Sequence, residues 1–166
     1  MSDRTYTRFT IPLSVLANPA KAEAVRSALD FSTADFQSIL LSDPLPEEAS
    51  GHEGFAVRLV DGRPCLVYEE EDCNYAGTET EDALIAADIP FIQVNGTGDE
   101  YGPSSTVFDG DTSEVIRLSH DLEPVVGIGV VDGRVTVDAQ EVADYERYLT
   151  LRAAVLLWPA MLSAAG

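Results

Sequence analysis

Polar and apolar residues alternate over residues 6–12, and this period of two predicts a β-strand that ends at the proline. The dipeptide Asn18-Pro19 follows. Because Asn is a good N-cap residue and Pro suits the first helical position, it predicts the start of a helix. A second short helix is expected to begin at residue 32 or 33, before a loop over 42–54 that contains two prolines.

Two later stretches carry the same hairpin pattern, an Asp-Gly pair between runs of β-favouring residues. The first covers residues 55–68 and the second covers 125–138. Asp-Gly favours a type I′ turn, because both central residues of that turn need a positive φ. The letters VDGR occur in both hairpins. They fit either a duplicated hairpin–helix unit or the same turn chemistry used twice.

Between the hairpins, Thr78 and Glu81 form a capping box, which predicts a helix that ends before Pro90. Three short strands and one glycine-rich loop are expected after this helix. The strands cover 91–94, 106–108 and 114–118, the loop covers 95–105, and Asp109-Gly110 turns the chain between the last two strands.

The last helix is predicted from the capping box of Asp138 and Glu141 to about Leu157. Its buried stripe is expected to contain apolar residues at helical spacing: Val142, Tyr145, Leu149, Ala153 and Leu156. Three further residues widen the stripe beyond one face: Leu151, Val155 and Trp158. Either the helix is central to the fold or a second subunit covers its end, so one hypothesis is a homodimer through the C-terminal helix.

These elements predict one α+β domain over residues 1–166: a mostly antiparallel sheet, helices packed on one face, and a long C-terminal helix. The 45% hydrophobic fraction of the 166 residues suits one sizeable core. The N-terminus lacks the apolar segment of a signal peptide, and the most apolar run, 149–162, is too short to span a membrane. A cytoplasmic location is expected, with Cys65 and Cys73 as free thiols.

The strongest compositional signal is an acidic stretch over residues 64–116, which contains no lysine or arginine. It holds thirteen of the chain's 29 acidic residues, and the formal net charge of the chain is −19. Protein surfaces usually intersperse both signs because like charges repel, so a long stretch of one sign points to a function. The charge argues against direct binding to nucleic acid or an anionic membrane, and it favours a basic partner.

Candidate catalytic and metal-binding patterns are weak. The glycine-rich residues 96–102 do not form GxGxxG, and they carry carboxylates where a phosphate needs positive charge, so phosphate binding is rejected. Asp109 does not open an EF-hand loop, because Glu114 and His120 stand at positions six and twelve. Cation binding by clustered carboxylates stays open. Neither His52 nor His120 accompanies a nucleophile motif. No catalytic residue, cofactor or metal site is predicted.

With its small size, its acidic run from Glu69 to Glu114 and its lack of a catalytic motif, the chain resembles the DNA-mimic anti-defence proteins of phages and mobile elements, of the anti-CRISPR and antirestriction kind. Thirteen carboxylates match the charge of about 22 Å of duplex, at one charge per about 1.7 Å. The resemblance implies an inhibitor that binds a basic nucleic-acid-binding surface of a protein complex and blocks it. The expected contact residues are Glu69, Glu70, Glu71, Asp72, Glu79, Glu81, Asp82, Asp99, Glu100, Tyr101, Asp109 and Asp111.

Three other functions fit the same composition. Adaptation to high salt explains an acidic surface with few lysines, and Lys21 is the only lysine here. Such adaptation spreads acids over the whole surface, however, whereas these are concentrated in one stretch. A general acidic, protein-binding accessory role and a small hydrolase are the remaining alternatives.

Overall fold

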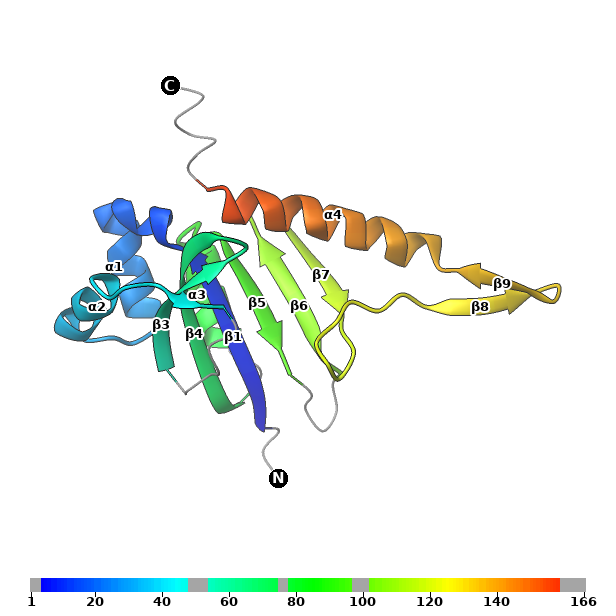
Figure 1. The fold of residues 1–166 in the computed structure, drawn as a ribbon, viewed down its shortest axis with the longest axis horizontal. Coiled ribbons are helices and arrows are strands. Elements are labelled where there is room, and N and C mark those ends of the chain that lie inside the picture. Colours follow the sequence, from blue (N-terminus) through cyan, green and yellow to red (C-terminus); the bar gives the residue numbers. More distant parts are fainter. Residues whose placement is uncertain (1–3, 48–53, 75–77, 97–101, 159–166) are drawn as a thin grey trace, which may run out of the picture.

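The computed structural model describes residues 4–47, 54–74, 78–96 and 102–158 (Figure 1). Its strands are β1 (Arg4–Pro12), β2 (Leu45–Pro46), β3 (Gly54–Val60), β4 (Arg63–Asn74), β5 (Phe91–Asn95), β6 (Ser104–Phe108), β7 (Ser113–Arg117), β8 (Ile128–Val131) and β9 (Arg134–Val137). Its helices are the short 3₁₀ helix η1 (Leu13–Ala17), α1 (Pro19–Ala28), α2 (Thr33–Leu40), α3 (Thr78–Ala86) and α4 (Ala139–Leu156).

Seven strands form one sheet in the order β2-β3-β4-β1-β5-β6-β7, with β1 at its centre. The short β2 pairs in parallel with β3, and the other neighbouring pairs are antiparallel. The α+β class, the mostly antiparallel sheet and the long C-terminal helix expected from the sequence are confirmed.

Both predicted hairpins are present, and both turn at an Asp-Gly pair with positive φ. The φ angles are 48° and 73° at Asp61 and Gly62, and 50° and 74° at Asp132 and Gly133. The first hairpin, β3–β4, lies inside the large sheet, whereas β8–β9 forms a separate two-stranded sheet. The two hairpins therefore share a turn but not a structural environment, which favours repeated turn chemistry over a duplicated unit.

Helices cover both faces of the large sheet, so the expectation of helices on one face is wrong. Consecutive residues of a strand point to opposite faces, and Leu66 and Val67 of β4 belong to two different cores. The first core includes Val25 of α1 and Leu84 of α3, and the second includes Val155 of α4. We call these two sides of the sheet the α3 face and the α4 face.

The inner side of α4 differs from the stripe that its apolar pattern predicts. Tyr148 and Val155 face the sheet and are buried, and so is Leu156 of the predicted stripe. Three other members of that stripe are exposed: Val142, Leu149 and Ala153. The Tyr148 hydroxyl lies 2.7 Å from the Ser105 hydroxyl in a buried hydrogen bond. A polar-tipped side chain therefore occupies an inner position that an apolar pattern does not assign to it.

The residues expected at a dimer contact pack within their own chain. Val155 is fully buried in the second core, and Leu151 packs against that core. Trp158 packs against the first core, and its carbonyl accepts a hydrogen bond of 2.7 Å from the Ser14 hydroxyl. The end of α4 thus reaches both cores, and the broad stripe gives no support to a dimer through this helix. None of the helices in the described part of the chain has both the length and the apolar character that crossing a bilayer requires.

The second hairpin, β8–β9, projects from the body of the molecule as an arm beyond the N-terminal end of α4 (Figure 1). Its register pairs Ile128 with Val137 and Val130 with Val135, so these four side chains share one face. They are 56–76% exposed. The arm therefore presents an apolar face to solvent.

The base of the arm is fixed to the body by hydrogen bonds. The Asp138 N–H donates to the Gly127 carbonyl at 2.9 Å. The Glu141 carboxylate accepts from the Gly127 N–H and also pairs with Arg117 of β7. Asp138 caps α4 as predicted, by accepting from the N–H groups of Gln140 and Glu141. In the expected capping box the Glu141 carboxylate would accept from the N–H of Asp138. It instead accepts from the Gly127 N–H at the base of the arm and pairs with Arg117 of β7.

Candidate functional site

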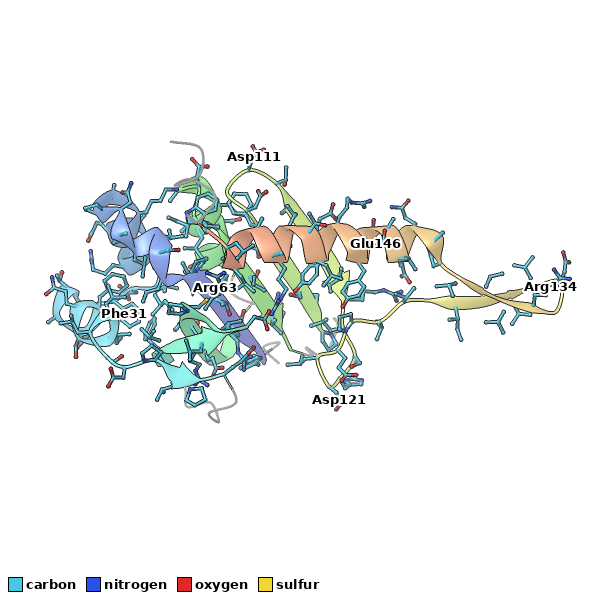
Figure 2. All side chains as sticks on the ribbon, turned by 45° about the horizontal axis from the view of Figure 1, so that its top comes forward. Phe31, Arg63, Asp111, Asp121, Arg134 and Glu146 are labelled. Atoms are coloured by element: carbon cyan, nitrogen blue, oxygen red, sulfur yellow. The ribbon has the colours of Figure 1, made fainter. Side chains whose placement is uncertain are left out.

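The acidic residues of the 64–116 stretch occupy both ends of the sheet. One end, where β1 begins and β4 ends, contains Glu70, which pairs in register with Thr7. At the opposite end β1 finishes at Pro12 and the antiparallel β5 begins at Phe91. Phe91 pairs with Phe108, the last residue of β6, so the turn between β6 and β7 lies at this end too. Asp109 and Asp111 lie between β6 and β7, and Figure 2 shows Asp111 in that turn. The expected contact residues are therefore not gathered at one end.

Glu69 is buried, so it does not present its charge at the surface as expected. Only 5% of the residue is exposed, and its Oε1 accepts a hydrogen bond of 2.7 Å from Arg8 Nε. The Tyr6 hydroxyl donates to the same oxygen at 3.3 Å. Burial is the main cause that raises the pKa of Tyr6 to about 12, so this hydroxyl keeps its proton. Glu69 therefore serves an internal ion pair on the α4 face.

Glu70, the next residue, points to the other face of β4. It is half-buried, and its Oε2 accepts a hydrogen bond of 2.8 Å from the Tyr68 hydroxyl two residues earlier. The backbone of Glu71 and Asp72 lies in the last part of β4, but their side chains are outside the described part of the chain. Asp99, Glu100 and Tyr101 lie outside the described residues altogether.

Three expected contact residues lie on α3, in its first two turns. Glu79 and Asp82 are exposed, whereas Glu81 is half-buried. Glu81 contacts the amide of Gln93, a fully buried residue of β5 on the α3 face. The Gln93 amide also donates to Asn95 at 3.2 Å. Glu79 and Asp82 can therefore meet a partner directly, while Glu81 is partly used within the fold.

We expect Glu81→Gln to gain stability over the wild type as the pH rises above 4.5. Burial, and then the charge of Asp82, raise the pKa of Glu81 above its usual 4.5. The folded state therefore holds this proton more tightly than the unfolded state, and ionising Glu81 costs free energy of folding. Glutamine removes that cost. Urea unfolding of both proteins at about pH 4 and about pH 7 measures the difference.

The control for this change is Glu79→Gln, which removes an exposed carboxylate from the same turn of α3. It measures the effect of removing one negative charge from the surface of α3, and the Glu81→Gln result is compared with it. If Glu81→Gln shows the same difference from the wild type at both pH values, Glu81 does not titrate as its environment requires.

The β6–β7 turn is held by Asp109 and leaves Asp111 exposed. Asp109 Oδ1 accepts from the N–H of Asp111 at 3.0 Å and from the N–H of Thr112 at 2.8 Å. The carboxylate of Asp109 therefore stabilises the turn, while Asp111 is exposed.

The end of α3 meets this turn. Asp88 lies two residues beyond the helix, and its carbonyl oxygen approaches Gly110 closely. A side chain at Gly110 would place its Cβ 3.6 Å from this oxygen. Asp88 itself is exposed, like Asp111. Four exposed carboxylates thus follow α3 and continue to the turn. We call Glu79, Asp82, Asp88 and Asp111 the acidic strip.

Most described arginines are paired with carboxylates outside the strip. The ion pairs are Arg8 with Glu69, Arg26 with Glu23, Arg117 with Glu141, Arg147 with Glu114 and Asp144, and Arg152 with Asp61. Lys21 lies beside the strip, where its ammonium donates to the Asp88 carbonyl at 2.7 Å. Among the described residues no salt bridge engages a strip carboxylate, so the strip is mainly negative, with Lys21 as a positive charge beside it.

The described residues offer little for metal or thiol chemistry. Within them, no group of three or more His, Cys, Asp or Glu side chains is arranged to hold a metal ion. Cys65 is a free, buried thiol, and burial raises the pKa of Cys65 to about 12, so it does not form a reactive thiolate at neutral pH. Cys73 has no described side chain. His120 is exposed near the end of β7.

Sequence reasoning missed a cavity on the α4 face, which Arg8, Arg58 and Arg152 help to line. Arg58 alternates with apolar neighbours in β3, a weak signal that its side chain shares a face with Ala56 and Val60. Of the α4 residues that line the cavity, Tyr145 and Leu149 were expected in the buried stripe of the helix. The sheet order and the packing of α4 on the sheet bring these three arginines to one cavity.

Comparisons of the chain with protein-family models, with curated proteins and with solved structures found no match.

Proposed function

We propose that this protein is a non-catalytic inhibitor that binds a basic, nucleic-acid-binding surface of a protein complex through its acidic strip. The observation that carries the proposal is the strip itself. Its four carboxylates are exposed along one helix and the adjoining turn, while most of the described arginines pair with other acids. A mainly negative surface on a rigid helix attracts a basic partner and speeds its association.

The spacing of the strip supports competition for a few basic residues. At 1.5 Å of rise per residue, Glu79 and Asp82 lie about 4.5 Å apart along the axis of α3. One strand of duplex DNA carries a phosphate every 3.4 Å or so of its axis. The axial spacing of Glu79 and Asp82 is therefore similar to the phosphate spacing along one DNA strand. The proposed contact is with a row of basic side chains rather than with a whole groove.

The test is a charge-reversal variant with Glu79, Asp82 and Asp111 each changed to lysine. Pull-down from a lysate of the source organism, eluted with a salt gradient, first yields the partner. We then expect the purified partner to bind this variant about tenfold more weakly, with a shallower salt dependence, since fewer charges take part. Duplex DNA should displace the wild type from the partner.

The matched control reverses three exposed acids away from the strip: Asp121, Glu123 and Glu146. Both triple variants change the net charge equally, so they separate the strip from the field of the whole molecule. Equal weakening by both variants, or none by either, would exclude the strip as the contact. Retention of no partner at low salt would favour salt adaptation instead.

A general protein-binding accessory role is the second candidate, and the apolar face of the arm favours it. Exposed apolar patches commonly mark sites of protein association. In this case the partner would stay bound at high salt and would be lost when Val130 and Val135 are changed to threonine. The same change would leave an electrostatic complex intact.

A further inference from the structure

The α4 face of the sheet contains a cavity of about 420 Å³ that is independent of the acidic strip. Typical small-molecule sites have volumes of about 300–1,000 Å³. Residues of α4, including Tyr145 and Leu149, form one wall. Leu122 and Pro124 of the segment after β7 form another, and the strands form the floor. Figure 2 shows α4 passing over the strands that supply this floor.

The floor combines polar and apolar positions in register. Arg8 of β1 pairs with Glu69 on one side and with Val94 on the other, and Val94 pairs in turn with Ser105. The next row on the same face contains Val67, Thr10 and Ile92. The apolar side chains can therefore hold a hydrocarbon body, while one edge of the floor is charged.

The charged lining is mainly positive, although the chain as a whole is strongly acidic. Arg8, Arg58 and Arg152 line the cavity, against Glu47 as the lining carboxylate. Arg58 lines the cavity and is only 7% exposed, so packing within the fold fixes the position of its side chain. Each guanidinium has five N–H donors, and the ion pairs of Arg8 and Arg152 each use one nitrogen.

We propose that this cavity binds a small amphiphilic carboxylate, with its head group on the arginines and its hydrocarbon chain on the apolar floor. Arginine binds carboxylates with two parallel hydrogen bonds, and this geometry selects a planar anion. A hydrocarbon chain would cover mainly Val94 and Leu149, the more exposed apolar side chains of the lining, and so remove their surface from water. Glu69 and Asp61 partly balance the charges of Arg8 and Arg152, so the proposed head group would bind to the guanidinium nitrogens that these ion pairs do not engage.

The probe is octanoate, with octylammonium as a matched cation of the same chain length. Methyl-resolved NMR of the full chain reports the position of binding without any substitution. Octanoate should shift the methyl signals of Val67, Val94 and Leu149 in a saturable way. The methyl signals of Val130 and Val135 on the distant arm should stay in place, and octylammonium should leave all of them unchanged.

The role of the arginines is tested with Arg58→Met, which keeps a long side chain without charge. It should weaken octanoate binding at least tenfold, whereas Arg63→Met, at an exposed arginine that does not line the cavity, should not. Absence of saturable shifts in the wild type, equal shifts with octylammonium, or equal shifts on the arm would each overturn the proposal. So would unchanged affinity in folded Arg58→Met.

Discussion

Leu84→Ala is expected to lower the free energy of unfolding by about 2–5 kcal/mol, the usual cost of emptying a buried leucine site. Leu84 is fully buried in the first core and belongs to α3, the helix that carries Glu79 and Asp82. Domains of this kind are stable by only about 5–15 kcal/mol, so the loss is a large fraction of the total. Chemical denaturation measures it, and the midpoint should fall with little change in slope.

The adjacent residue provides the control. Ile85 is 37% exposed, so Ile85→Ala removes a side chain of the same size from the same helix without leaving a buried cavity. Its cost should be about 1 kcal/mol or less, and the higher helix propensity of alanine offsets part of it. If the two variants lose equal stability, α3 does not pack on the sheet through Leu84, and the support for the acidic strip fails with it.

Arg8→Met is expected to cost about 2–3 kcal/mol, somewhat below the 3–5 kcal/mol typical of breaking a fully buried ion pair. The change leaves Glu69 buried beside Tyr6 without its cation. The side chain of Glu69 is 6% exposed, and that of Arg8 is 38% exposed. Because Arg8 is partly hydrated in the folded state, its own desolvation cost is small, and most of the loss comes from the stranded carboxylate. Thermal or urea unfolding measures the change.

Arg147→Met is the matched comparison, since it also removes an arginine paired with carboxylates. Arg147 contacts Glu114 at 2.7 Å and also pairs with Asp144, but its side chain is 50% exposed. Exposed pairs of this kind contribute little to stability because solvent screens them, so the loss should be clearly smaller than for Arg8→Met. Equal losses from both substitutions would mean that burial of Glu69 contributes nothing to the strength of its pair.

Local signals in the sequence predicted the elements well. Alternation identified β1, the Asp-Gly pairs placed both turns, and the cap at Asp138 placed the start of α4. These signals act within a few residues, so no knowledge of the fold is needed to use them. The continuous apolar run from Cys65 to Val67 also carried information, because a strand that is apolar at consecutive positions is buried on both faces. Applied to β4, this rule indicates helices on both sides of the sheet.

The features that depend on strand order were beyond the sequence. Glu69 was grouped with Glu70 as a surface acid, because neighbouring letters do not show that β1 places Arg8 opposite Glu69. The apolar pattern of α4 failed at Tyr148 for the same reason, since its partner Ser105 lies 43 residues earlier. The acids of α3 and of the β6–β7 turn come near each other where Gly110 approaches the Asp88 carbonyl, and the sequence does not show this approach.

The arm has a consequence for how stability is distributed in the molecule. All eight residues of β8 and β9 are exposed, so closing the arm buries no core side chain. An isolated two-stranded hairpin is marginally stable in water, and segments with little buried surface open at low cost. The arm and the body are thus separate cooperative units, joined at Gly127 and Asp138. A probe in the large sheet follows unfolding of the body, whereas a probe at Arg134 follows a far more frequent local opening.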